Sequence, residues 1–150
     1  MLVSQKSQYA LRAVFELAKL YDKGTVKIAQ IAQAQSIPPR FLEVILSQLK
    51  QGGFVESRRG NEGGYMLIPE PAELTVGQVI EFIQGPVGPI DCMLENSKIP
   101  RCPQYGGCVF MDMWQQVRDA ILSVYESTTF ADLIEQQKQM SQKYVASYCI

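Results

Sequence analysis

Apolar residues recur at the spacing of an amphipathic helix in six stretches of the chain. These stretches are residues 4–21, 27–35, 36–50, 74–83 and 109–125, and a sixth that Thr129 caps. Two short β-prone runs, residues 54–58 and 65–68, flank a turn-rich segment between the third and fourth helices. The pattern therefore predicts a mainly α fold with one small β-hairpin.

The third stretch, residues 36–50, separates its two faces most clearly. Four apolar residues mark one side of the expected helix and four polar residues the other: Leu42, Ile45, Leu46 and Leu49, then Arg40, Glu43, Ser47 and Lys50. Pro38 and Pro39 suit the first turn, where a missing N–H costs nothing. An ordinary surface helix would show the same pattern, but a short helix at 27–35 ends only a few residues earlier. Two helices joined by a tight turn are typical of a helix-turn-helix, whose second helix reads DNA.

The predicted hairpin directly follows the helix at residues 36–50, as a wing does in a winged helix-turn-helix. Arg58, Arg59, Gly60 and Asn61 lie at its tip. The glycines there let the backbone approach a phosphate, or let an arginine enter a minor groove. A plain surface hairpin is the alternative, but the order of three helices and a hairpin favours DNA. Residues 1–70 are therefore predicted to form a winged helix-turn-helix DNA-binding domain.

Residues 71–150 are predicted to hold the dimerisation helices. The stretch 109–125 carries a wide apolar stripe, which includes Phe110, Met113, Trp114, Val117 and Ile121. A long apolar helix outside a small winged domain usually buries its face against a second copy, and dimeric DNA readers need that symmetry. Packing back onto its own domain is the alternative.

A loop at residues 88–108, rich in proline and glycine, holds Cys92, Cys102 and Cys108. Soft thiolates select iron–sulfur clusters, zinc or copper(I). Three thiolates are one fewer than the usual four ligands, and the chain contains no histidine, which counts against zinc. Three free thiols, open to redox chemistry, are the alternative. The loop is predicted to be a sensor.

The net charge of −1 hides an asymmetry between the two ends of the chain. Residues 1–60 hold nine Lys and Arg against four Asp and Glu, whereas the remainder holds five against eleven. A basic front half suggests that this end faces a polyanion.

Without a long apolar run or a signal-peptide pattern, the chain is expected to be cytoplasmic, with no membrane partner. Without histidine, a nucleophile motif or a phosphate-binding loop, it is not expected to be an enzyme.

Together these motifs resemble the IscR-like family of bacterial regulators, which also includes nitric-oxide, iron and cysteine-metabolism sensors. The resemblance covers nearly the whole chain: SQKSQYALRAVFELA, IAQIAQAQSIPPRFLEVILSQL, RRGNEGGYML, LTVGQVIEFI and the cysteine loop. It implies a homodimer that is joined through the long helix and binds a palindromic operator in double-stranded DNA. It also implies an iron–sulfur cluster, [2Fe–2S] or [4Fe–4S], with Cys92, Cys102 and Cys108 as its ligands.

The resemblance further implies which residues touch DNA. Arg40, Phe41 and Glu43 would face the major groove, and Arg59 the minor groove. The expected DNA-binding set is completed by Lys27, Pro39, Ser47, Arg58, Gly60 and Asn61.

Two positions depart from the family's pattern. Members with a [2Fe–2S] cluster often place a histidine three residues after the last cysteine, where this chain has Met111. Others take an acidic ligand from near the N-terminus of the partner subunit, where this chain has Gln8. The fourth ligand therefore stays open among Gln8, Asp91, Glu95, Met111, Asp112, a water molecule and a small thiol.

The expected function is that of a dimeric transcriptional repressor whose operator affinity is set by a cluster on the three loop cysteines. A cluster-free thiol-redox regulator, or one that contains zinc, is the alternative. A redox or electron-transfer iron–sulfur protein is a further alternative, but it leaves the basic N-terminal half without a purpose.

Overall fold

The computed structural model describes residues 3–94, 102–104 and 106–148, with side chains described up to residue 143. Within these residues the elements follow the order α1 Gln5–Lys19, α2 Ile28–Gln35, α3 Pro39–Gln51, β1 Val55–Arg58, β2 Gly64–Leu67, α4 Val76–Gln84, the short 3-10 helix η1 Asp91–Met93, α5 Met111–Ser127 and α6 Phe130–Tyr148. The predicted fold, mainly α with a small hairpin after a helix-turn-helix, is confirmed. None of the helices described here has an apolar stretch long enough to cross a bilayer.

Helix α1 is the centre of the winged part, since α2, α3, α4, α6 and β2 all contact it. Its N-cap is Ser4, as predicted, and the Ser4 Oγ accepts a hydrogen bond from the Ser7 N–H at 3.1 Å. Ser7 is fully buried, and its hydroxyl donates to Gln84 Oε1 of α4 at 3.1 Å. This buried contact joins the start of the chain to the end of α4.

Helix α3 packs its apolar stripe against α1. Leu42, Ile45, Leu46 and Leu49 are each at most 1% exposed, and burying such a side chain contributes about 2 kcal/mol. The helix begins at Pro39 and not at Ser36, because Ser36 takes the left-handed conformation, with φ at 50°, and ends α2. Ile37 in the turn is buried, and its N–H donates to the Ala32 carbonyl at 3.0 Å. The turn between the two helices is therefore only three residues long, Ser36–Pro38.

The hairpin pairs Val55 with Leu67 at one end and Arg58 with Gly64 at the other. It is not isolated, because Val26, just before α2, forms a bridge to Tyr65 through two N–H···O bonds of 2.8 Å. The helix-turn-helix and the wing are thus joined through backbone hydrogen bonds as well as through the core.

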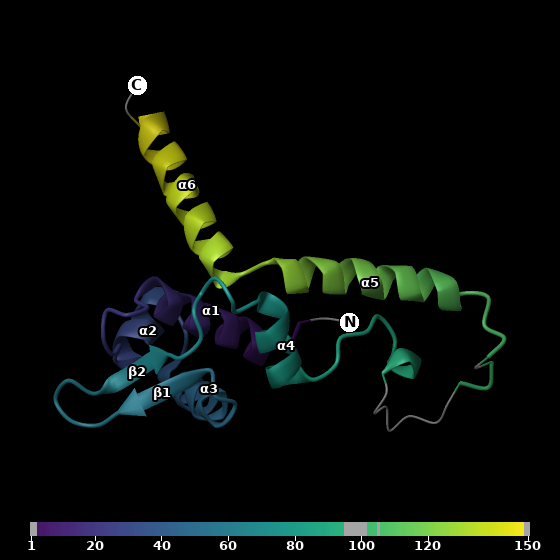
Figure 1. Ribbon diagram of the computed structural model, residues 1–150, viewed down its shortest axis with the longest axis horizontal. Helices are drawn as coiled ribbons and strands as arrows, with labels where there is room; N and C mark the ends of the chain where they lie inside the picture. Colours follow the sequence, from purple (N-terminus) through teal and green to yellow (C-terminus); the bar gives the residue numbers. More distant parts are fainter. Residues whose placement is uncertain (1–2, 95–101, 105, 149–150) are drawn as a thin grey trace.

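Helices α5 and α6 extend away from the winged part, as Figure 1 shows, and the junction between them is anchored to the start of α4. Val76 N–H donates to the Thr128 carbonyl at 2.9 Å, and Phe130 N–H donates to the Leu74 carbonyl at 3.0 Å. The Phe130 side chain is fully buried in the same core as Leu74 and Val79. The core therefore draws residues from both sides of the predicted division at residue 70, and that division itself stays a prediction.

Helices α4 and α6 both begin with side-chain caps. The predicted capping box of α4 is present, since Thr75 Oγ1 accepts from the Gln78 N–H and Gln78 Oε1 accepts from the Thr75 N–H. At α6, Asp132 Oδ2 accepts from the N–H of Thr129 at 3.0 Å and from its hydroxyl at 2.7 Å. These hydrogen bonds lower the pKa of Asp132. The anchored junction is thus fixed by local chemistry at each helix start.

We expect Phe130→Ala to destabilise the protein by about 3–5 kcal/mol, because it removes a fully buried aromatic ring and leaves a cavity. Urea unfolding followed by circular dichroism would measure the loss. Met140→Ala is the control, since Met140 on α6 is exposed and its truncation should cost less than about 0.5 kcal/mol. Equal stability of the Phe130 variant and the unsubstituted chain would contradict the anchoring role.

Candidate nucleic-acid interface

The exposed face of α3 is the first part of the candidate site. Burial of Leu42, Ile45, Leu46 and Leu49 turns the opposite side of the helix to solvent. Five sequence-predicted contact residues of this helix are exposed there: Pro39, Arg40, Phe41, Glu43 and Ser47. A shallow groove along the same side is lined by Glu43, Val44, Ser47, Gln48 and Gln51. The packing of the helix therefore decides which side chains a duplex would meet.

The tip of the wing is the second part. Arg58, Arg59, Gly60 and Asn61 are all exposed. The turn is closed by a hydrogen bond from the Gly63 N–H to the Gly60 carbonyl at 2.9 Å, and Gly60 has a φ of 105°, which favours glycine. Thr25 Oγ1 donates to the Glu62 carbonyl, which holds the tip beside the segment before α2. The tip is therefore placed by two points of contact and not by the strands alone.

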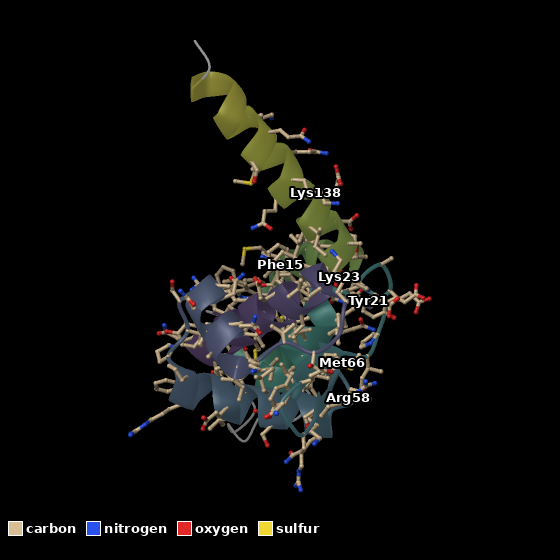
Figure 2. The ribbon with its side chains drawn as sticks, turned by 90° about the vertical axis from the view of Figure 1, so that its left-hand side faces the viewer. Phe15, Tyr21, Lys23, Arg58, Met66 and Lys138 are labelled. Carbon is tan, nitrogen blue, oxygen red and sulfur yellow. The ribbon has the colours of Figure 1, made fainter. Side chains whose placement is uncertain are left out.

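A polar groove lies between the wing and the start of α2. Its lining includes the cations Lys23, Lys27, Arg58 and Arg59, together with Thr25, Gln30 and Asn61. Lys23 and Arg58 line the same groove, and Figure 2 shows Arg58 low on the molecule, well separated from Lys138 of α6. Within the described part of the chain, no carboxylate forms an ion pair with Lys23, Lys27 or Arg59, and Arg58 has only an exposed contact of 3.6 Å with Glu56. Exposed pairs of this kind hold a cation weakly, so the charges are available to a polyanion.

Sequence reasoning missed three features of this surface. Lys23 and Gln30 were not among the expected contact residues, because only the fold brings the loop before α2 next to the wing. Val44 was missed because an apolar residue in an amphipathic helix is normally assigned to the core, yet here it is 60% exposed. A count of outward positions from the buried stripe would have found Val44.

Close approach of backbones fixes the base of the wing. A Cβ atom on Gly64 would lie 2.5 Å from the Val26 carbonyl oxygen, which is backbone and cannot swing aside. Glycine at this position is therefore what lets β2 come close enough to pair with Val26.

The cysteine loop is described in part. Cys92 lies in η1 and is half-buried, Cys102 is exposed, and Cys108 is half-buried just before α5; all three are free thiols. In the described ranges, no three Cys, Asp or Glu side chains come together as a group that could hold a metal ion. The possible fourth ligands are placed differently. Asp91 lies within the loop, and Met111 and Asp112 follow it at the start of α5. Gln8 Nε2 donates to the Val3 carbonyl at 3.1 Å, and Glu95 lies outside the described residues. The soft donors suit a cluster chemically, and their assignment as ligands stays a prediction.

The predicted dimer face lies on α5. No residue of this helix is buried in the described chain. Phe110, at its N-cap, is 58% exposed, Met113 and Val117 are exposed, and Trp114 and Ile121 are half-buried. The helix contacts α4, but its apolar stripe is left largely open to solvent. Large exposed apolar patches mark contact surfaces, and the dimer stays a prediction.

Comparison with known proteins identifies what this arrangement is similar to. The Rrf2 family, described as an iron-dependent transcriptional regulator, matches residues 3–136. The HTH-type transcriptional regulator CymR of Bacillus subtilis (strain 168) is 34% identical over 133 residues, which cover 89% of each chain. The solved structure of CymR (YrzC), the global cysteine regulator of B. subtilis, aligns with a TM-score of 0.74 at 33% identity, covering 91% of this chain and 98% of that one. The structure of T. potens IscR aligns with a TM-score of 0.75 at 29% identity, covering 93% and 90%.

We expect Gly64→Ala to destabilise the protein by about 1–3 kcal/mol, because the added methyl group must push Val26 and β2 apart. DNA binding should also weaken, although no charge changes. Urea unfolding and fluorescence anisotropy with a labelled duplex would measure the two effects. Gly107→Ala is the stability control, since a Cβ there meets no atom within 4 Å. A Gly64 variant as stable as the control would show that the wing does not need this close approach.

Proposed function

This chain belongs to the Rrf2 family of winged helix-turn-helix transcriptional regulators, and we propose that it acts as a homodimer that represses transcription from a palindromic DNA operator. Membership of that family makes it a regulator and not an enzyme. The observation that carries the proposal is the exposed face of α3 beside a wing tip with two exposed arginines. A repressor of this kind works where the operator is, in the cytoplasm of a bacterium.

The roles of the individual residues follow from the chemistry of the two grooves. Glu43 would accept a hydrogen bond from a cytosine N4 amino group in the major groove, and Arg40, Phe41 and Ser47 would lie beside it. Arg59 would enter the minor groove, where arginine is attracted to negative potential. Contacts with the sugar–phosphate backbone fix position without reading sequence. They would be made by the side chains of Lys27, Arg58 and Asn61, by the backbone N–H of Gly60 and by the ring of Pro39.

Dimerisation would bring two such surfaces onto one face of the duplex. The open apolar stripe on α5 supports it, since Phe110, Met113 and Val117 are exposed and lie next to half-buried Trp114 and Ile121. A two-fold axis through paired α5 helices would place two recognition helices in successive major grooves, about 34 Å apart.

The sensor is proposed to be an iron–sulfur cluster held by Cys92, Cys102 and Cys108. The family's description as iron-dependent and the three soft donors support it. When bound, such a cluster supplies a group that responds to oxidation, nitric oxide or iron supply. The chain's own contribution is to link the loop to DNA binding. Cys108 lies three residues before Met111, the first residue of α5, and the far end of α5 is anchored to α4 by the Val76–Thr128 hydrogen bond.

A second candidate is a regulator that senses through the thiols themselves, or one with zinc in place of a cluster. It is favoured by the exposure of Cys102 and by the similarity to the global cysteine regulator of B. subtilis. Both candidates share the same DNA interface and differ only in what the three sulfur atoms hold.

We expect Arg59→Ala to weaken operator binding and to reduce the slope of log affinity against log salt by about one for each subunit, hence by about two for a dimer. Lys138→Ala is the control, because Lys138 is an exposed cation on α6 far from the wing. Anisotropy titrations at several salt concentrations would measure the slopes. An unchanged slope would remove Arg59 from the interface, and a change of about one would favour a single bound subunit.

Protein purified without oxygen should be brown and show sulfide-to-iron charge-transfer bands in its visible spectrum. Serine in place of Cys92, Cys102 or Cys108 should remove most of that absorption. The control is Cys149→Ser, since Cys149 is the fourth cysteine of the sequence and lies outside the loop, and this variant should retain the absorption. A colourless protein that carries zinc, or no metal, would reject the cluster and leave the second candidate. Since the DNA interface does not include these residues, the serine variants should still bind duplex DNA non-specifically.

A further inference from the structure

The middle of the exposed face of α3 is apolar. Leu42, Ile45, Leu46 and Leu49 face the core, and the helical repeat places Val44 almost directly opposite to them. Val44 is 60% exposed. It lines the groove that runs past Glu43 and Ser47, so it shares its surface with residues proposed to meet the major groove.

Phe41, one turn earlier on α3, extends the same apolar surface. It is 62% exposed, and its ring lies 6.5 Å from that of Tyr9, centroid to centroid, at an angle of 54°. Tyr9 is itself held by a hydrogen bond of 2.9 Å from Gln5 Nε2 to its hydroxyl and by Arg12, whose guanidinium lies 6.0 Å from the ring centroid. Phe41 and Val44 also line one groove between α1 and α3. The pair is therefore a fixed apolar surface, because Val44 is β-branched and has one preferred rotamer in a helix.

Polar and charged side chains border this apolar pair. Glu43, Ser47, Gln48 and Gln51 lie on one side, and Gln5 and Lys6 on the other. The cations Lys27, Arg58 and Arg59 line a separate groove at the wing and have no strong intramolecular partner among the described residues, so the winged part as a whole is suited to a polyanion. A duplex is thus the occupant that the charge pattern favours over a second protein chain.

A DNA major groove offers one apolar group at the base edges, the 5-methyl group of thymine. We propose that Val44, with Phe41 beside it, reads a thymine by van der Waals contact with this methyl group. The inference rests on the proposed function and adds the base that an apolar side chain would select. Polar side chains would form hydrogen bonds with other base pairs, whereas Val44 would gain affinity only from contact with the methyl group.

The test removes only that methyl group. An operator is first selected from random duplexes with the full-length protein, and each thymine pair related by symmetry is then replaced by uracil. At one such pair, affinity should fall by about fourfold for each lost methyl contact, hence by about fifteenfold for both half-sites. Val44→Ala should bind the thymine operator more weakly and no longer distinguish thymine from uracil at that pair.

Two further variants complete the experiment. Val44→Thr keeps the branched shape and one methyl group, so it should retain part of the thymine preference. Ile68→Ala is the matched control, since Ile68 is another exposed branched residue, 49% exposed, and lies after β2 away from the tip. It should keep the full preference.

The outcomes separate this inference from the proposed function. Tight binding of selected operators that tolerate uracil at every position would overturn the thymine contact and leave the DNA-binding function intact. Absence of preference for any selected duplex would overturn the proposed function itself. If Val44→Ala changes the mass of the assembly measured by sedimentation but not the thymine preference, the apolar pair is an interface between copies and the inference is wrong.

Discussion

Burial of one stripe of α3 against α1 is the interaction on which the rest of this structure depends. Leu42, Ile45, Leu46 and Leu49 fix the rotation of α3 about its own axis, and small residues such as Ala10 and Ala13 on α1 let the two helices approach closely. The rotation of the helix then determines which side chains between Arg40 and Gln51 face the solvent. A rotation of α3 by one residue would bury Glu43 and expose Leu42, so stability and sequence reading are set by the same contacts.

A second constraint concerns the distance between the loop cysteines, which we propose to be the sensor, and the winged part. The loop cysteines and the winged part are connected through α5, a helix of 17 residues that spans about 25 Å. One end of α5 follows Cys108, and the other is held at Val76, Leu74 and Phe130. A helix that is anchored at one end and largely uncovered along its length transmits a change as a rigid element. This layout suits a regulator in which events at sulfur alter how two reading surfaces are spaced.

Most of the fold follows from local sequence signals, and the exceptions have specific causes. Periodicity and caps located the helices, including Ser4 and the Thr75–Gln78 capping box. Pro38 and Pro39 do lie at the start of α3, as predicted. Ser36 and Ile37 of the predicted stretch precede the helix, because Ser36 adopts a left-handed conformation, which is more often seen in glycine or asparagine. Phe130 gave no signal, since it is the first residue of its helix and its burial depends on Leu74 from another segment. In the candidate site, residue types identified the basic wing and the thiols, but Lys23 and Val44 became visible only when packing placed them.

The bridge between Val26 and Tyr65 fixes the base of the hairpin, and the Thr25–Glu62 hydrogen bond holds its tip beside the segment before α2. The exposed side chains of the tip, such as Arg59 and Asn61, can change without disturbing the core, provided that Gly64 keeps its close approach to Val26. The wing tip and the exposed face of α3 can therefore change independently of each other. A change at the wing tip could alter the preferred groove width while the exposed face of α3 stays the same, so related regulators could diverge in target by small, independent steps.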